Sequence, residues 1–228
     1  MTSSALIVFD LDGTLVDTAP DLVAALNFVL QREGLPLVPV ASARTMIGAG
    51  ARKLIERGLE LRDRSLSVRE IDQLTEDFIA YYRDHIADES RPFEGLHATL
   101  DTLEARGFSF AVCTNKLEGL SRLLLDRLDM TARFAAICGA DTFGVSKPDP
   151  AILRQTIARA GGDPGRAIMV GDSGPDVGVA RRAGIPVVGV TFGYTETPIA
   201  DLNPDIVIGH MQDLPHAVAS LTTRFTSA

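Results

Sequence analysis

Short, largely continuous apolar runs recur along the chain. Their length and β-branched content are typical of strands whose two faces are both covered, as in a parallel sheet. The runs are Ala5–Phe9, Ser109–Cys113, Ala167–Val170, Pro186–Thr191 and Ile206–Ile208, with a weaker one at Phe134–Cys138. Helical patterns lie between most of them, as at Asp149–Ala160 and at Gly174–Ala183. Strands that alternate with helices predict an α/β domain with a doubly wound parallel sheet.

One connection is too long for this alternation. Nearly a hundred residues separate Asp10 from the strand that begins at Ser109, and a crossover helix needs far fewer. Two helical stripes fill this stretch. They consist of Leu22, Val23, Leu26, Val29 and Leu30, and of Val68, Ile71, Leu74, Phe78 and Tyr82. We therefore expect an α/β core of residues 1–17 and 91–228 and an inserted all-helical domain of residues 18–90, with linkers near Thr18–Asp21 and Ala87–Pro92.

Composition narrows the classes of function. The chain has 228 residues, of which 46% are hydrophobic, so it can bury a real core. Its formal net charge of -8, from 30 acidic and 22 basic residues, argues against non-specific nucleic-acid binding, which needs a basic surface. An anionic substrate stays possible, because a metal ion or a few lysines make a site locally positive. No apolar run approaches the roughly 18 residues of a membrane span.

Cysteine and histidine usage gives no metal-ligand pattern. Cys113 and Cys138 each close a short apolar run, and we expect two reduced core thiols in a cytoplasmic protein. The four histidines are scattered without zinc-type spacing and are interpreted as surface or packing residues. They are His85, His97, His210 and His216.

Polar residues follow three of the expected strands. Asp10 ends the first strand, Thr114 follows Ser109–Cys113, and Asp172 follows the run "AIMVG". In an open α/β sheet, the carboxyl ends of the strands form the ligand crevice. Three polar residues at this edge, together with the pair Asp10 and Asp12, therefore indicate a site.

Each of these residues also has a purely structural interpretation. Asp12-Gly13 is a common turn pair, Thr114 can cap the helix expected near Leu117, and Ser173-x-x-Asp176 resembles a capping box. Lys147, expected in the first turn of the following helix, fits this interpretation less well. The helix dipole disfavours a cation there by a few tenths of a kcal/mol, whereas a bound anion would reverse the sign.

Taken together, these residues suit phosphoryl transfer. Asp10 and Asp172 can hold Mg²⁺, which prefers carboxylate oxygens. Without a metal and Lys147, a phosphate dianion would be repelled by the carboxylates, since like charges about 4 Å apart repel by several kcal/mol at an effective dielectric near 20. The Thr114 hydroxyl can donate to a phosphoryl oxygen. Asp10 can attack phosphorus, and Asp12 can protonate the leaving oxygen and then activate water.

The sequence resembles the haloacid dehalogenase superfamily of phosphatases, and most closely its phosphoglycolate phosphatase branch. It carries "DLDGT" at Asp10–Thr14, "CTNK" at Cys113–Lys116, "SKPDP" at Ser146–Pro150 and "VGDSGPD" at Val170–Asp176. These segments match the four motifs of the family in order, and the resemblance spans nearly the whole chain.

The resemblance implies a role for each matching residue. Asp10 would be the nucleophile and a metal ligand, and Asp12 the general acid and base that also offers Mg²⁺ a backbone carbonyl. Asp172 would be the third metal ligand, with Asp176 supporting the site from behind. Thr114 and Lys147 would hold the phosphoryl group, with Asn115 close by. The inserted helices would be the mobile cap of the family, which closes over the substrate.

Substrate choice is less determined. Val16–Leu22 and Met46–Leu59 resemble phosphoglycolate phosphatases, and Arg52 with Lys53 can meet a substrate carboxylate or can simply be a solvated pair. Many relatives have Arg-Asn where this chain has Gly174-Pro175. The expected partner is a small phosphorylated metabolite, with 2-phosphoglycolate foremost, and the expected state is a monomer or homodimer.

Other functions stay open at this point. Sugar and amino-sugar phosphates are alternative substrates, and a phosphomutase similar to β-phosphoglucomutase has the same core motifs. A dehalogenase is disfavoured because a halide leaves without a proton and gives Asp12 no task. Non-enzyme alternatives are a phosphoaspartate switch, which would lack the insertion and Asp12, and a non-catalytic binding protein.

Overall fold

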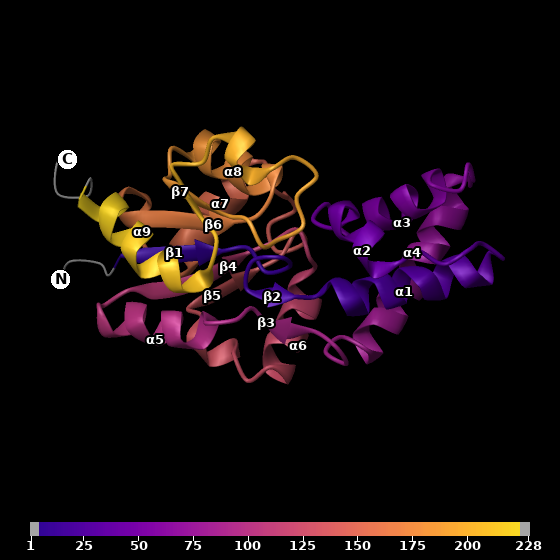
Figure 1. Ribbon diagram of the computed structural model, residues 1–228, viewed down its shortest axis with the longest axis horizontal. Coiled ribbons are helices and arrows are strands. Elements are labelled where there is room, and N and C mark those ends of the chain that lie inside the picture. The colour runs from indigo at the N-terminus through magenta and orange to yellow at the C-terminus, as the bar shows by residue number, and fades with distance from the viewer. Residues whose placement is uncertain (1–4, 224–228) are drawn as a thin grey trace.

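The computed structural model describes residues 5–223, and its centre is a six-stranded sheet (Figure 1). All strand pairs in it are parallel, and the order across the sheet is β5-β4-β1-β6-β7-β8. The strands are β1 (Leu6–Phe9), β4 (Ser109–Cys113), β5 (Ala136–Cys138), β6 (Ala167–Gly171), β7 (Val187–Val190) and β8 (Ile206–Ile208). The doubly wound α/β fold predicted from the apolar runs is confirmed, with strand ends that differ by at most two residues.

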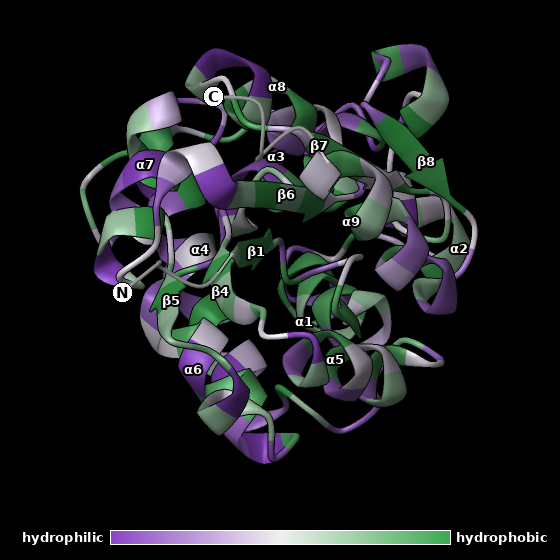
Figure 2. Ribbon diagram, turned by 90° about the vertical axis from the view of Figure 1, so that its left-hand side faces the viewer, coloured by the Kyte–Doolittle hydropathy of each residue, from purple (hydrophilic) through white to green (hydrophobic). Residues whose placement is uncertain are grey.

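The two faces of the sheet bury alternate residues of each strand. Leu6 and Val8 of β1 pack in a cluster with helices α7 (Pro150–Arg159) and α8 (Gly174–Ala183). Ile7 and Phe9 belong to a second cluster with α5 (Leu96–Ala105), α6 (Glu118–Arg127) and α9 (Leu214–Thr222). Figure 2 shows the apolar strands between α7 and α8 on one side and α5 and α9 on the other. Burial of both faces explains why the strand sequences are continuously apolar.

Between residues 19 and 84 the regular elements are all helices, and we call this segment the helical insertion. They are α1 (Ala19–Arg32), α2 (Val40–Ala43), α3 (Ala51–Glu60) and α4 (Val68–Asp84), with a 3₁₀ turn at Arg44–Met46. The insertion lies beside the sheet at one end of the molecule (Figure 1). The chain leaves and re-enters the core through a short antiparallel pair, β2 (Val16–Asp17) with β3 (Arg91–Pro92). The exact domain boundaries, 17/18 and 90/91, stay a prediction.

Of the ten stripe residues expected in the insertion, eight are buried, Ile71 is half-buried and Val68 is exposed. All five stripe residues of α1 are buried, as are Leu74, Phe78 and Tyr82 of α4. Val68, in contrast, is 69% exposed, because it is the first residue of α4, in the turn that Ser67 and Glu70 cap at the surface. The apolar face of α4 therefore begins later than the sequence pattern predicts.

The rest of the described chain adds short elements. Four further 3₁₀ turns lie at Thr131–Arg133, Pro164–Arg166, Ile199–Leu202 and Met211–Asp213. None of the helices between residues 5 and 223 is both long and apolar enough to cross a membrane. Cys113 and Cys138 are buried free thiols on register-paired strands, and burial raises the pKa of Cys113 to about 12. Both thiols thus lie in the core, as expected.

Candidate active site

The site is assembled at the carboxyl edge of the sheet, on both sides of β1. In chain order the sheet runs 3-2-1-4-5-6, so the direction of winding reverses between β1 and β6. Asp10 follows β1 and Asp172 follows β6, which places both at this reversal, where open α/β sheets bind ligands. Thr114 follows β4 on the other side of β1. The three residues singled out at strand ends are therefore neighbours in space.

Three carboxylates form a compact buried cluster. Asp10, Asp172 and Asp176 each bring one oxygen within 4.8 Å of the others, and all three side chains are buried. Asp176 comes from the first turn of α8, where its Oδ2 accepts hydrogen bonds from the Ser173 amide (3.0 Å) and hydroxyl (2.6 Å). The helix-capping contact foreseen for Ser173 thus exists, and it holds Asp176 in the cluster.

Lys147 is the cation of this cluster. Its Nζ lies 2.6 Å from Asp176 Oδ1 and 2.9 Å from Asp10 Oδ1. The expectation that Lys147 lies in the first turn of a helix is wrong. Helix α7 begins at Pro150 with Asp149 as its N-cap, so Lys147 sits in the loop before it. Burial lowers the pKa of Lys147, but Asp10 and Asp176 more than offset this, and the pKa lies above its ordinary value.

The charge balance of the cluster calls for a further cation. If all three carboxylates were ionised, they and the one ammonium would leave a net charge of -2 in a buried place. Burial raises the pKa of Asp10 to about 6, opposed by Lys147 and assisted by Asp176. Burial, then Asp176 and Asp10, raise the pKa of Asp172 well above its ordinary value. A hard divalent cation such as Mg²⁺ fits this donor set, since it prefers carboxylates and would neutralise the excess charge.

Two glycines leave room for the Asp172 side chain. A Cβ on Gly13 would lie 2.5 Å from Asp172 Oδ2, and Gly13 also has a φ of 83°. A Cβ on Gly193 would lie 2.2 Å from Asp172 Cβ. The carboxylate accepts hydrogen bonds from the Thr14 hydroxyl (3.1 Å) and from the Tyr194 amide (2.7 Å). The "DGT" segment therefore cradles the aspartate that ends β6, a contact that no local turn requires.

Asp12 has a different set of partners from Asp10. Its two oxygens lie 2.9 and 3.1 Å from Lys116 Nζ, and its Oδ1 also accepts a hydrogen bond from the Thr18 hydroxyl (2.8 Å). Lys116 Nζ donates further to the Tyr82 hydroxyl (3.0 Å). Sequence reasoning missed Lys116 and Tyr82 as site residues. The signal for Lys116 was its place in "CTNK", whereas Tyr82 is an ordinary position in an apolar helical stripe.

Thr114 and Asn115 follow β4, so they lie on the side of Asp10 that is opposite to Asp172. Thr114 is 2% exposed, and its hydroxyl accepts from the Lys116 amide (3.2 Å). It does not cap α6, whose N-cap is Leu117. Asn115 accepts from the Lys147 amide (2.9 Å) and donates to the Gly48 carbonyl of the insertion (3.3 Å). Asn115 thus positions the loop that carries Lys147 and contacts the insertion.

A cavity of about 270 Å³ opens between these residues and the insertion. Asp10, Asp12 and Thr114 line it from the core, and apolar residues such as Leu54 and Phe78 line it from the insertion. Arg52 lines it too, with its guanidinium paired to Asp72 and Glu56. Lys53 is not among the lining residues and pairs with Glu56 (3.1 Å).

Gly174 and Pro175 line a second, smaller cavity of about 160 Å³. They leave Asp176 in register with the cluster, since Pro175 falls in the first turn of α8, where its missing N–H costs no helical hydrogen bond. The departure from "Arg-Asn" in the fourth motif therefore does not disturb the carboxylates.

A protein-family model and several curated proteins match this chain over most of its length. A model of the family described as haloacid dehalogenase-like hydrolase matches residues 7–190. The phosphoglycolate phosphatase of Agrobacterium fabrum is 48% identical over 215 residues, covering 94% of this chain and 92% of that protein. The phosphoglycolate phosphatase of Caulobacter vibrioides is 47% identical over 221 residues, with 97% and 93% covered.

A solved structure agrees with the sequence relatives. It is the crystal structure of a predicted phosphoglycolate phosphatase from Haemophilus somnus, 32% identical, with a TM-score of 0.86 and coverage of 95% of this chain and 99% of that one. The expectation of a haloacid dehalogenase-type phosphatase, rather than a switch or a binding protein, is thereby confirmed. The chain belongs to the haloacid dehalogenase-like hydrolases, in the branch similar to phosphoglycolate phosphatases.

Proposed function

We propose that this phosphatase is a Mg²⁺-dependent phosphomonoester hydrolase that works through an aspartyl-phosphate on Asp10. The observation that carries the proposal is the buried cluster of Asp10, Asp172 and Asp176 with Lys147. Asp10 also lines the cavity, together with Asp12 and Thr114. This arrangement supports the assignment of a nucleophile, an acid or base and a cation site beside a cavity that a phosphate ester can enter.

The metal would be held by Asp10 and Asp172, by the Asp12 backbone carbonyl and, from behind, by Asp176. When bound, Mg²⁺ would supply positive charge that lets a phosphate dianion approach the carboxylates. Lys147 contributes the second positive charge from its place between Asp10 and Asp176. Lys147 and the Thr114 hydroxyl would hold the oxygens of the phosphoryl group.

The reaction has two half-steps on the residues of this chain. In the first, a carboxylate oxygen of Asp10 forms a bond to phosphorus while the bond to the leaving oxygen breaks, and Asp12 gives that oxygen a proton. In the second, Asp12 takes a proton from a water molecule whose oxygen attacks phosphorus. The bond between phosphorus and Asp10 then breaks, which releases phosphate and restores both aspartates.

The proposed substrate is 2-phosphoglycolate. The relatives that are nearly half identical over almost the whole chain bear the name of that activity. The cavity is mostly apolar, and Arg52 offers it a cationic group. A substrate carboxylate would compete with Asp72 and Glu56 for the Arg52 guanidinium. Lys53 would act only at longer range, since it pairs with Glu56 outside the cavity.

The test is phosphate release from a panel of small phosphomonoesters that includes 2-phosphoglycolate and sugar phosphates. Wild type is assayed with Mg²⁺ and with EDTA, beside Asp10→Asn and the exposed control Asp201→Asn. We expect hydrolysis of 2-phosphoglycolate that EDTA and Asp10→Asn abolish and Asp201→Asn leaves unchanged. In Arg52→Gln, KM for 2-phosphoglycolate should rise about tenfold, the effect of one lost charged hydrogen bond, with little change for ethyl phosphate.

Each result decides a part of the proposal. Activity confined to a sugar phosphate would keep the mechanism and replace the substrate. Transfer of the phosphoryl group to a second sugar, with no phosphate release, would identify a phosphomutase. Undiminished activity in Asp10→Asn would overturn the aspartyl-phosphate. The cytoplasmic location and the monomeric or homodimeric state stay predictions.

A further inference from the structure

Lys116 is a buried cation with no place in the reaction described above. Its side chain is 5% exposed, and its ammonium group has three N–H donors. Three acceptors lie within hydrogen-bond distance, namely the two oxygens of Asp12 and the hydroxyl of Tyr82. Because these three contacts use its donors, Lys116 is not available to bind a phosphate ester. Its function must lie in what it does to Asp12 or to Tyr82.

The two aspartates of "DLD" therefore have separate lysines. Lys147 contacts Asp10 at 2.9 Å, and Lys116 contacts Asp12 at 2.9 Å. Burying a carboxylate and an ammonium is costly unless the geometry and the hydrogen bonds are good. The pair of Asp12 and Lys116 meets this condition, since Lys116 spans both carboxylate oxygens. Asp12 is thus fixed in orientation before any substrate contacts it.

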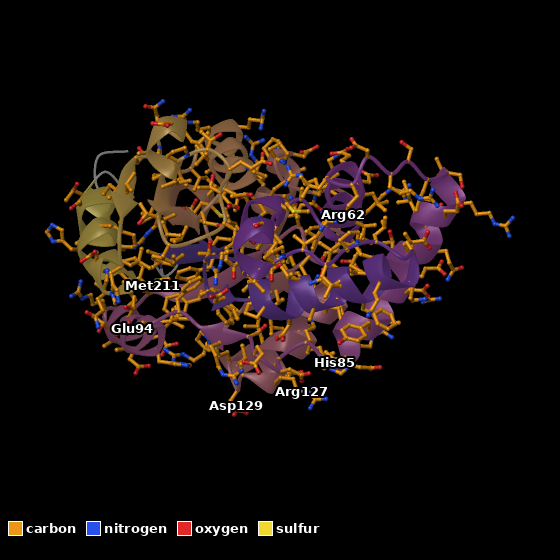
Figure 3. All side chains as sticks on the ribbon, turned by 45° about the vertical axis from the view of Figure 1, so that its right-hand side comes forward. Arg62, His85, Glu94, Arg127, Asp129 and Met211 are labelled. Carbon is orange, nitrogen blue, oxygen red and sulfur yellow. The ribbon has the colours of Figure 1, made fainter. Side chains whose placement is uncertain are left out.

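Tyr82 connects this pair to the helical insertion. It belongs to α4, is 1% exposed, and places its ring 4.5 Å from Lys116 Nζ in a cation–π contact. Burial raises its pKa to about 12, so the hydroxyl stays neutral and accepts from Lys116. The next residue, Tyr81, faces the other way and stacks on His85, which lies at the outer surface (Figure 3). Only one of the two neighbouring tyrosines therefore faces the site.

We propose that Lys116 is the positioning residue of Asp12, and that the insertion controls this position through Tyr82. The inference rests on the proposed role of Asp12 as proton donor and acceptor. When α4 lies against the core, Tyr82 and Asp12 hold Lys116 between them, and Asp12 is aimed into the cavity that both residues line. When α4 moves away, Lys116 loses one of its three acceptors, so its ammonium group is less fixed and orients Asp12 less strictly, although the Thr18 hydroxyl still donates to Asp12. Proton transfer is thereby favoured in the closed enzyme, which holds the attacking water molecule but excludes bulk solvent.

The first test compares two leaving groups. An alkyl phosphate needs a proton on its leaving oxygen, whereas 4-nitrophenyl phosphate releases a stable phenolate without one. In Lys116→Met we expect kcat for the best alkyl phosphate to fall about 100-fold, the lower range of general acid–base effects. Single-turnover release of 4-nitrophenol should fall far less. Tyr82→Phe should also lose more activity on the alkyl phosphate than on the aryl phosphate, but with a smaller fall in kcat. Because this variant keeps the packing of the ring, it can be measured even if Lys116→Met does not fold.

The second test observes the contact without using activity. The chain contains three lysines, at positions 53, 116 and 147, so ¹³Cε-labelled lysine gives three resolvable NMR signals. The signal lost in Lys116→Met belongs to Lys116. The chemical shift of its ε-methylene protons should be displaced by the ring current of Tyr82. We expect this displacement to vanish in Tyr82→Leu and to persist in the matched control Tyr81→Phe, which should also keep wild-type kcat.

The outcomes separate this inference from the proposed function. Asp12→Asn is the reference, and it should show the same preference for the aryl ester as Lys116→Met. Equal losses on both esters in Lys116→Met, beside a clear preference in Asp12→Asn, would overturn the positioning role alone. An unchanged Lys116 signal in Tyr82→Leu would overturn the link to the insertion. Equal losses in Asp12→Asn, or a wild type inactive on every ester, would overturn the proposed function and the inference with it.

Discussion

At the scale of single residues, the carboxylates differ mainly in how their charge is compensated. Asp12 has one ammonium to itself, whereas Asp10, Asp172 and Asp176 share Lys147. The shared set is therefore short of positive charge, and burial makes this shortage expensive. The same set of residues that would bind a cation well would destabilise the protein when the cation is absent. Function and stability are thus linked at one cluster.

The metal-free protein should lose stability as the pH rises. The pKa of Asp10 is raised from 3.8 to about 6 by burial, so the folded state binds a proton more tightly than the unfolded state. Ionisation between pH 4 and pH 6 then costs up to about 3 kcal/mol of unfolding free energy. Urea denaturation in EDTA across this pH range should show the loss in wild type. Asp10→Asn should show a flatter pH profile of unfolding free energy, and Mg²⁺ should restore the stability of wild type near pH 7.

Parallel pH profiles for wild type and Asp10→Asn would contradict this expectation. The pH profile of Asp10→Asn is subtracted from that of wild type, because other carboxyl groups also titrate in this range and contribute to both proteins alike. A difference that opens between about pH 4 and pH 6 belongs to Asp10 and to the groups coupled with it.

At the scale of elements, the two ends of the insertion are tied to each other as well as to the core. Asp21, in the first turn of α1, is 3% exposed and accepts from the amides of Glu89 (3.0 Å) and Ser90 (2.8 Å). Its Oδ2 also accepts from the Ser90 hydroxyl (2.6 Å). One carboxylate therefore joins the start of α1 to the segment that returns to β3. The expected linkers at Thr18–Asp21 and Ala87–Pro92 contain both partners of this contact.

Asp21→Ala should destabilise the protein strongly. It removes the acceptor of two amides and a hydroxyl, and unsatisfied buried donors cost about 1–3 kcal/mol each. We expect a loss of about 3 kcal/mol, measured as a fall in the urea midpoint with an unchanged m-value. Asp84→Ala, at the exposed end of α4, is the matched control and should change stability by less than about 0.5 kcal/mol. Equal small effects in both variants would show that the Asp21 contacts add nothing.

Elements and strand-end residues were predictable from the sequence for the same physical reason. Continuous apolar runs require burial on both faces, and a parallel sheet brings strand ends such as Asp10 and Asp172 to one edge. The partners of Asp12 were not predictable, because Tyr82 at helical spacing looks like a core residue and its contact with Lys116 exists only after the insertion packs on the core. Lys147 was misplaced by a few residues because Pro148, Asp149 and Pro150 allow a helix to begin at more than one position.

At the scale of the whole molecule, one loop of the core contacts the carboxylate cluster, the strand β2 and the insertion. Tyr194, in the loop after β7, donates its amide to Asp172 and its hydroxyl to Asp17 of β2. The same hydroxyl accepts from the Ala19 amide at the start of α1 (3.0 Å). Arg44 of the insertion lies over the Tyr194 ring (5.2 Å) and pairs with Asp17 (2.7 Å). The carboxylate cluster, the connecting strand and the insertion thus meet at a single residue, the first through its backbone amide and the other two through its side chain.

Tyr194→Phe separates these contacts, because it removes the hydroxyl but keeps the ring and the backbone amide. The Ala19 amide then keeps only its longer contact with Asp17 Oδ1 (3.4 Å), so we expect unfolding free energy to fall by about 1 kcal/mol and hydrogen exchange to accelerate at the start of α1. Mg²⁺ affinity, measured by calorimetry, should stay within about twofold of wild type, since Asp172 is bound through the backbone. Tyr81→Phe serves as the control for loss of a tyrosine hydroxyl away from this junction. A loss of Mg²⁺ binding free energy as large as the loss of unfolding free energy would contradict this expectation. It would mean that the Tyr194 hydroxyl acts on the metal site, and that the insertion and the metal are coupled through Asp17.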